Sequence, residues 1–489
     1  MTTSTRSRCA TGISGLDELL GGGLPLHRLY LLQGRPGVGK TTLALQFLFE
    51  GVRNGEKGLY ITLSETRAEL DAVAESHGWD LNEFDVLELS AVEEALGDTQ
   101  ENTFFQPSEL ELSKTAQVLL NEVERVKPAR VVLDSLSEVR LLAEVPLRYR
   151  RQMLKLKQYF AGRQITVLLL DDLTGGDSDL HIQSIAHGVL TLDKLAQGYG
   201  VQRRQIQINK LRGVKFREGS HDYLIERGGL MVFPRLIAAE HRKGFKQEPV
   251  SSGIAEFDKL LGGGLDRGTS NLFIGPAGSG KSTVALHHAV RVADMGEKAI
   301  IFIFDENRKT LETRSKALGL DLEKHVREGR IHVMQVDPAD LTPGQFAQKV
   351  RDAVEKDDVQ LVMIDSLNGY LNSMPDERFL SLQLHELLSY LSQLGIVTIM
   401  TLAQHGIMGT MQTPVDVTYL SDTVVLFRYF EATGEVRKAI SVMKKRSGVH
   451  EPSIRELKMS ARGLQVGEPL TGFQGILTGV PQIIRDAKS

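Results

Sequence analysis

Two stretches of this sequence combine glycines, a lysine and a hydroxyl residue at a spacing that suits phosphate binding. GRPGVGKT spans Gly34–Thr41 and GPAGSGKS spans Gly275–Ser282. In the pattern G-x-x-x-x-G-K-S/T, backbone N–H groups wrap a triphosphate, the lysine reaches its terminal phosphates and the hydroxyl ligates Mg²⁺. A single copy could be a chance glycine-rich turn, but two copies in register favour nucleotide sites. The predicted phosphate-binding residues are Gly34, Gly37, Val38, Gly39, Lys40, Thr41 and Thr42 in one copy and Gly275, Gly278, Ser279, Gly280, Lys281, Ser282 and Thr283 in the other.

One aspartate in each half follows an apolar run and could complete a metal site. Asp134 in RVVLDS and Asp365 in LVMIDS end apolar runs, where phosphate-loop proteins place the carboxylate that holds Mg²⁺. Each aspartate could instead cap the following helix. We predict two Mg²⁺ sites, one formed by Thr41 and Asp134 and the other by Ser282 and Asp365.

A second group of acids follows the run after each phosphate loop. ITLSET places Ser64–Glu65, and IFDENR places Asp305–Glu306 at the matching position. A carboxylate there could orient and deprotonate an attacking water, so Glu65, Asp305 and Glu306 are candidate catalytic residues. The alternative is a solvated carboxylate at a helix start. The second half has two acids where the first has one, which predicts unequal activity.

A basic triplet comes late in each half: Lys210-Leu211-Arg212 and Lys444-Lys445-Arg446. Residues two apart on a strand share a face, so Lys210 and Arg212 point the same way, as do Lys444 and Arg446. These cations could reach the γ-phosphate held by a neighbouring subunit, as trans-acting arginines do. They could instead protect an exposed edge strand. Recurrence in both halves favours the catalytic interpretation.

The elements that must position these residues are repeated. The leader at 11–24 matches the leader at 252–265, and the offset of 241 residues that separates Lys40 from Lys281 holds throughout them. A repeat this long indicates two copies of a whole domain. The polar stretch before Pro249 reads as a linker. We therefore predict an N-terminal domain over 1–240, a linker over 241–250 and a C-terminal domain over 251–489.

Within each half, short apolar runs alternate with amphipathic helical stretches and end in hairpins. This pattern is typical of an α/β domain with a mostly parallel sheet between helices. Leucine stripes over 148–160 and 378–394 predict helices that face the core. The expected parallel strands are 29–33, 58–64, 84–89, 129–135 and 165–171 in the first half, and 271–275, 299–305, 331–336, 359–366 and 396–402 in the second.

Composition narrows the class of protein. The 489 residues are 41% hydrophobic and 25% charged, as in ordinary globular proteins, and a net charge of −4 argues against a nucleic-acid scaffold. The single cysteine, Cys9, permits no internal disulfide, which predicts a reducing, cytoplasmic location. No run reaches the ~18 apolar residues of a membrane span, and we expect neither export nor a membrane anchor.

The motifs together resemble the KaiC family of RecA-type ATPases. GISGLDELLGGGLP, the phosphate loop, LSET, HGWDL, VVLDS, INKLRG and GLMVFP carry the resemblance, and the second half repeats the set, from about Thr11 to Pro481. The resemblance implies two tandem RecA-like P-loop NTPase domains and a homohexamer of two stacked rings with Mg·ATP at subunit interfaces. It further implies ATPase activity in the N-terminal ring, autokinase and autophosphatase activity in the C-terminal ring of circadian clock members, and protein signalling partners.

Position by position, the resemblance assigns roles to particular residues. Glu65 matches the second of two N-terminal catalytic glutamates, with Ser64 in place of the first, and Asp305–Glu306 matches the C-terminal pair. Ser76 matches a residue near the adenine. The basic residues Lys210, Arg212, Lys444 and Arg446 match trans-acting residues, and Leu211 matches a nucleotide contact.

Two departures from the family pattern affect the expected function. Clock members carry adjacent Ser-Thr phosphoacceptors where this chain has Thr418-Tyr419, so Thr418 is a candidate phosphoacceptor but could equally be an ordinary strand threonine. The long C-terminal tail that receives a stimulating partner has no counterpart after GILTGVPQIIRDAKS. We therefore expect a regulatory or stress-signalling ATPase of this type rather than a full oscillator.

Two other functions remain open from the sequence. A recombinase-like DNA-binding filament would need basic central loops, and the segments after Asp134 and Asp365 are not strongly basic. A signalling adaptor, in which ATP clamps the ring without significant turnover, gains support from Ser64.

Overall fold

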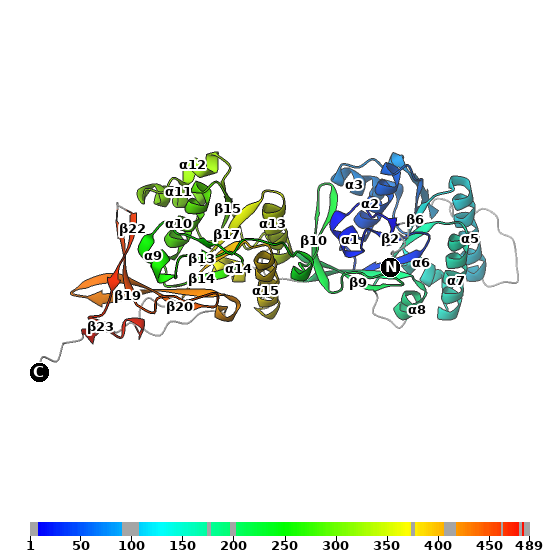
Figure 1. The fold of residues 1–489 in the computed structure, drawn as a ribbon. Coiled ribbons are helices and arrows are strands. Elements are labelled where there is room, and N and C mark those ends of the chain that lie inside the picture. Colours follow the sequence, from blue (N-terminus) through cyan, green and yellow to red (C-terminus); the bar gives the residue numbers. More distant parts are fainter. Residues whose placement is uncertain are drawn as a thin grey trace, which may run out of the picture. The chain divides into compact units, whose positions relative to one another are not determined.

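The computed structural model describes residues 8–89, 107–173, 178–195, 202–372, 377–404, 417–460, 463–478 and 482–483. The described chain divides into two compact units, the first ending at Arg235 and the second beginning at Leu236 (Figure 1). Each unit is built around one nine-stranded sheet. Among the described helices, none is both long enough and apolar enough to cross a lipid bilayer.

The first unit has a sheet of order β11-β10-β9-β8-β3-β7-β6-β4-β5. Strands β8 through β5 in this order pair in parallel, and β8 to β11 pair antiparallel as successive hairpins. In chain order the elements are β1 (Arg8–Cys9), α1 (Ser14–Leu19), β2 (Leu24–Pro25), β3 (Leu29–Gly34), α2 (Lys40–Arg53), β4 (Gly58–Thr62), α3 (Arg67–His77), η1 (Leu81–Glu83), β5 (Asp85–Glu88), α5 (Pro107–Val126), β6 (Arg130–Asp134), α6 (Leu136–Ala143), α7 (Pro146–Gly162), β7 (Thr166–Asp172), α8 (Ser178–Ile185), β8 (Gly188–Leu195), β9 (Arg203–Leu211), β10 (Ser220–Glu226) and β11 (Gly229–Phe233).

The second unit repeats this topology with the order β16-β15-β17-β18-β14-β19-β20-β21-β22. Its elements are η2 (Ala238–Glu240), β12 (Pro249–Val250), α9 (Ala255–Leu260), β13 (Leu265–Asp266), β14 (Ser270–Gly275), α10 (Lys281–Asp294), β15 (Lys298–Ile303), α11 (Arg308–Ala317), α12 (Leu322–Arg327), β16 (Ile331–Gln335), α13 (Pro343–Glu355), β17 (Val359–Asp365), α14 (Leu367–Asn372), α15 (Glu377–Gln393), β18 (Val397–Ala403), η3 (Thr418–Leu420), β19 (Thr423–Ala432), β20 (Glu435–Lys445), β21 (Arg455–Ser460), β22 (Gly463–Pro469), β23 (Phe473–Gln474), η4 (Ile476–Thr478) and β24 (Gln482–Ile483).

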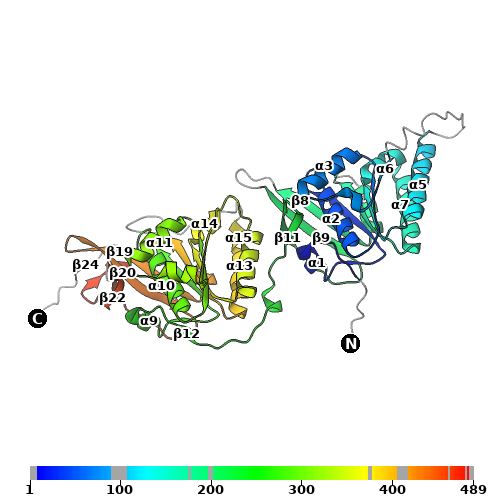
Figure 2. The same cartoon turned by 90° about the horizontal axis from the view of Figure 1, so that it is seen from above.

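Both faces of each sheet are covered, which explains why the central strands are apolar throughout rather than alternating. In the first unit, Tyr30 and Leu32 of β3 pack under α2 and α3, while Leu31 packs on the opposite face with α5 and α7 (Figure 2). In the second unit, α10 to α12 cover one face and α13 to α15 the other. The predicted α/β fold with two tandem domains is confirmed, and the leucine-rich helices α7 and α15 face the core as expected.

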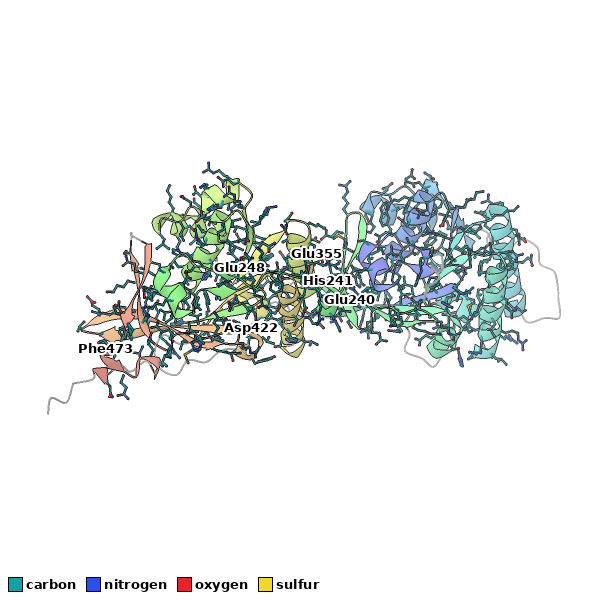
Figure 3. The ribbon with its side chains drawn as sticks, in the orientation of Figure 1. Glu240, His241, Glu248, Glu355, Asp422 and Phe473 are labelled. Carbon is teal, nitrogen blue, oxygen red and sulfur yellow. The ribbon has the colours of Figure 1, made fainter. Side chains whose placement is uncertain are left out.

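The segment predicted as a linker lies against the second unit. The Lys243 backbone N–H donates to the carbonyl of Gln393 over 3.2 Å. The His241 ring stacks edge-on against Tyr390 with centroids 5.0 Å apart, and its Nδ1 lies 3.4 Å from Glu355 (Figure 3). Residues 236–250 therefore follow the surface of the domain they introduce.

The turn from β3 into α2 forms the first phosphate loop, and the turn from β14 into α10 forms the second. Gly39 is the N-cap of α2 with φ +98°, and Gly280 caps α10 with φ +110°. A Cβ on Gly39 would lie 2.4 Å from Cδ1 of Ile225 on β10. The hairpin β10–β11 thus packs closely on the loop, so a side chain at this position would have to displace the end of Ile225.

We predict that Gly39→Ala destabilises the first unit more than Gly37→Ala. Both positions have positive φ, which costs an alanine about 1–2 kcal/mol. A Cβ on Gly37 meets nothing within 4 Å, so its substitution carries only that backbone cost. Gly39→Ala adds overpacking against Ile225, worth about 1–3 kcal/mol more. Urea unfolding of the two variants measures the difference, and equal midpoints would contradict the close packing of the hairpin on the loop.

Candidate nucleotide sites at the carboxyl edges of the two sheets

The lysine of each phosphate loop folds back over its own loop. Nζ of Lys40 donates to the Gly34 carbonyl over 2.9 Å, and Nζ of Lys281 donates to the Gly275 carbonyl over 2.9 Å and to that of Pro276 over 2.7 Å. Burial lowers the pKa of Lys281 to about 8. Each lysine is therefore held at the mouth of a loop that opens at a helix N-terminus, where an anion is stabilised.

The predicted metal ligands come together in both units. Oγ1 of Thr41 lies 3.5 Å from Oδ2 of Asp134, and Oγ of Ser282 donates to Oδ1 of Asp365 over 2.8 Å. The contact follows from the fold, because β6 and β17 end at the same sheet edge as β3 and β14. A hydroxyl beside a carboxylate is a set of oxygen ligands that suits Mg²⁺. This ion is usually bound by only one or two protein side chains together with oxygen atoms of the substrate's phosphates.

The metal-side aspartates are oriented differently in the two units. The Tyr60 hydroxyl on β4 donates to Oδ2 of Asp134 over 2.5 Å, whereas the Thr401 hydroxyl on β18 donates to Oδ1 of Asp365. Burial raises the pKa of Asp134 above its ordinary value, an effect that a bound cation would oppose. Sequence analysis missed Tyr60 and Thr401, since a tyrosine or threonine within an apolar strand reads as core.

Glu65 begins a turn just past β4 and has the environment of a general base. Its backbone N–H donates to the Thr62 hydroxyl oxygen over 2.9 Å. Oε2 of Glu65 is buried and has no hydrogen-bond partner among the described residues. Burial, together with the charges of Asp134 and Glu69, raises the pKa of Glu65 to about 7. Such a carboxylate can take a proton from water near neutral pH.

The acids at the matching position of the second unit, Asp305 and Glu306, each accept a hydrogen bond from a neighbouring side chain. Arg314 on α11 donates to Oε2 of Glu306 over 2.6 Å, and the Ser366 hydroxyl donates to Oδ2 of Asp305. Burial raises the pKa of Glu306, while Arg314 opposes that effect. Oε1 of Glu306 is buried without a partner in the part of the chain that the structure describes. The candidate bases of the two units therefore have different surroundings, and sequence analysis missed Arg314.

The basic pairs do not lie at the phosphate loop of their own unit. Lys210 pairs with Val189, which pairs with Leu31, three residues before Gly34. Lys444 occupies the same register, at the level of Leu272 on β14. Three residues of strand span roughly 10 Å, so both pairs lie toward the amino edge of the sheet while the loops lie at the carboxyl edge.

Backbone carbonyls hold these cations in place. In the first unit, Lys210 donates to the Gln183 carbonyl over 2.6 Å and Arg212 to that of Ser184 over 2.9 Å. In the second, Lys444 donates to the carbonyls of Ser421 over 2.7 Å and Thr418 over 3.0 Å, and Arg446 to that of Tyr419 over 2.9 Å. The candidate phosphoacceptor Thr418 thus lies beside the cations and not beside its own phosphate loop.

Two residues assigned by resemblance have less distinctive surroundings. Ser76 is exposed on α3, and its hydroxyl donates to the Val73 carbonyl over 2.7 Å. The next residue, His77, reaches the first phosphate loop, with Nε2 3.4 Å from Oγ1 of Thr42. The side chain of Leu211 is buried in the core of the first unit.

Asp172 is an unforeseen member of the first site. Its Oδ1 lies 2.7 Å from Nζ of Lys40, and it pairs with Gly34 in the parallel register of β7 and β3. The signal was present in the sequence, because the run ITVLLLDD ends in an acid at a strand terminus, as Asp134 does.

Comparisons with known proteins agree with this geometry. The family model "ATPase: KaiC" matches residues 9–237 and 250–471. The circadian clock oscillator protein KaiC of Parathermosynechococcus lividus is 28% identical over 481 residues, covering 96% of this chain and 87% of that protein. The circadian clock protein KaiC3 of a Synechocystis species is 26% identical, covering 96% of this chain and 94% of that protein. The circadian clock oscillator protein KaiC of Synechococcus elongatus is 26% identical, with coverages of 99% and 93%. Because the family model matches both halves, the chain belongs to the KaiC family of ATPases.

Proposed function

We propose that this protein hydrolyses Mg·ATP at interfaces between copies of itself, in a homohexamer of two stacked rings. The placement of the basic pairs supports this proposal most strongly. Each unit has a phosphate loop, a metal-side aspartate and an acid at its carboxyl edge, but its basic pair lies toward the amino edge. A second copy that turns its amino edge toward the loop would supply the positive charge that phosphoryl transfer needs.

The residues divide the chemistry as follows in the N-terminal site. Lys40 and the N–H groups of its loop hold the terminal phosphates, and Thr41 and Asp134 hold the Mg²⁺. When bound, the metal neutralises charge that develops on the phosphate oxygens. Glu65 takes a proton from water as the water oxygen bonds to the γ-phosphorus, and the bond from that phosphorus to the bridging oxygen breaks to release ADP. Arg212 of the neighbour stabilises the transition state.

The C-terminal site has the same parts but a different acceptor at hand. Thr418 lies against Lys444, so an interface that brings Lys444 and Arg446 to the neighbouring γ-phosphate also brings Thr418 close to it. We propose that the Thr418 hydroxyl competes with water there, which would make the C-terminal ring an autokinase. The side chain of Tyr419, 56% exposed, is the other hydroxyl in this segment.

The biological role that we propose is regulatory. Three relatives are named as circadian clock proteins, and a ring whose two sites work at different rates could report nucleotide supply to signalling proteins. A cytoplasmic location remains a prediction from the sequence.

Catalysis in trans can be tested by mixing two variants that are each inactive at the C-terminal site. Both variants also carry Glu65→Gln, which suppresses turnover at the N-terminal site. Arg446→Ala should lower turnover by about 10³-fold or more, and Lys281→Ala should remove ATP from the C-terminal site. Mixed rings should regain activity. At some interfaces an Arg446→Ala subunit, whose phosphate loop is intact, meets a Lys281→Ala subunit, whose Arg446 is intact. Arg437→Ala, which changes a half-buried arginine elsewhere on β20, is the control and should keep its activity. Phosphate release that stays absent after mixing would contradict an interface site.

Turnover at the N-terminal site should fall as pH is lowered from 8 to 6. The pKa of Glu65 is about 7, so the carboxylate is mostly ionised at pH 8 and mostly protonated at pH 6. Loss of the base predicts a roughly tenfold decrease in initial rate. The measurement uses the Lys281→Ala chain to isolate this site. Glu65→Gln should be slow at every pH, and a flat profile in the chain that retains Glu65 would exclude it as the base.

Incubation with γ-labelled Mg·ATP should attach label to the protein, and Thr418→Ala should lose it. Thr433→Ala changes an exposed threonine in the turn that follows β19; this matched control should keep its label. Label that survives Thr418→Ala would assign the acceptor to another residue, and complete absence of label would reject the autokinase while leaving the ATPase in place.

A further inference from the structure

The lysines of the two phosphate loops, Lys40 and Lys281, differ in one interaction partner. Lys40 and Lys281 both donate to the carbonyl of the first loop glycine and approach that of the following residue. Lys40 also forms an ion pair with Asp172, in which the side chains are 10% and 36% exposed. Among the described residues, no carboxylate lies within ion-pair distance of Lys281.

Strand register explains this difference. Asp172 pairs with Gly34 in the first unit, and the residue that pairs with Gly275 in the second unit is Ala403. The two positions are equivalent, at the last residue of the strand beside the loop strand. One substitution therefore adds or removes a counter-ion for the loop lysine without changing its backbone contacts.

We propose that Asp172 competes with the terminal phosphates of ATP for Lys40, so that the N-terminal site binds ATP more weakly than the C-terminal site. This inference rests on the proposal that both loops bind ATP. Lys40 must exchange Asp172 for phosphate, and a carboxylate left at the loop repels the incoming anion. Among the described residues, the hydrogen-bond partners that Lys281 must leave are carbonyl oxygens, and Lys281 is a desolvated cation that an anion stabilises.

The surroundings of the first site strengthen the competition. Asp134 and Glu65 lie close enough to interact with Lys40 electrostatically, and Asp172 acts on both of them as a like charge. Lys40 thus has one carboxylate in contact and two more within electrostatic range, whereas Lys281 interacts electrostatically with Asp365 and forms no ion pair among the described residues. The corresponding acid in the second unit, Glu306, has its own cation in Arg314. Asp172 therefore positions the binding lysine, and it is not assigned to the chemical step.

The test measures binding of a non-hydrolysable ATP analogue with Mg²⁺ to the full chain by calorimetry. In a Lys281→Ala background, which leaves the N-terminal site, Asp172→Asn removes the charge at nearly constant volume. Its dissociation constant should fall about twofold to fivefold, as expected when a partly exposed ion pair no longer competes. Asp172→Glu keeps the charge and should bind as weakly as the chain with Asp172.

The reciprocal experiment adds a carboxylate at Ala403, the position of the second unit that corresponds to Asp172. In a Lys40→Ala background, Ala403→Asp should raise the dissociation constant of the C-terminal site by a similar factor. Ala403→Asn is matched in size and should have little effect. A purely structural role for Asp172 cannot produce this gain at a new position. Thermal unfolding of each variant identifies any that fails to fold, in which case the Asp172→Asn and Asp172→Glu pair decides.

The outcomes separate this inference from the proposed function. Unchanged or weaker binding in Asp172→Asn overturns the competition, even if ATP is hydrolysed normally. Equal binding of Ala403→Asp and Ala403→Asn overturns it as well. Failure of the analogue to bind either loop in the unaltered chain would instead refute the nucleotide sites on which the inference rests.

Discussion

Parallel pairing between neighbouring strands is the constraint on which both nucleotide sites depend. Because β3, β7, β6 and β4 run in the same direction, all four end at one edge of the sheet. The residues that follow or end those strands are far apart in sequence, yet Lys40, Asp172, Asp134 and Glu65 meet there. Apolar helices on both faces hold this register, since a slip of one residue would turn every buried side chain outward.

The ion pairs at the carboxyl edge of the sheet differ between the two units. In the first site Asp172 is paired with Lys40, and among the described residues no cation forms an ion pair with Glu65. The second site leaves Lys281 with carbonyl partners and ties Glu306 to Arg314. The same fold thus gives the loop lysine an acidic partner in one unit and the candidate base a cationic partner in the other. In the double ring that we propose, this difference would allow nucleotide affinity and turnover to be set separately in each ring.

The opposite edge of each sheet carries the complementary charge. The strands that hold Lys210 and Lys444 run antiparallel to their neighbours, so their carboxyl ends return to the amino edge. A unit therefore presents acids and a phosphate loop on one side and cations on the other. Two copies arranged head to tail would join these sides, and repetition of a head-to-tail contact closes a ring when its rotation permits.

Much of this was available from the sequence. The spacing of the loop glycines, the apolar runs that end in Asp134 and Asp365, and the offset between halves determined the fold class, the repeat and most candidate residues, because they rest on local pattern and on motifs that must be contiguous. Tertiary structure alone decided which residues meet. Tyr60, Thr401 and Arg314 give no local signal, and the contrast between Asp172 and Ala403 became visible only through their pairing with Gly34 and Gly275. A one-dimensional pattern states which side chains exist; the long-range register of a sheet determines which charge each one faces.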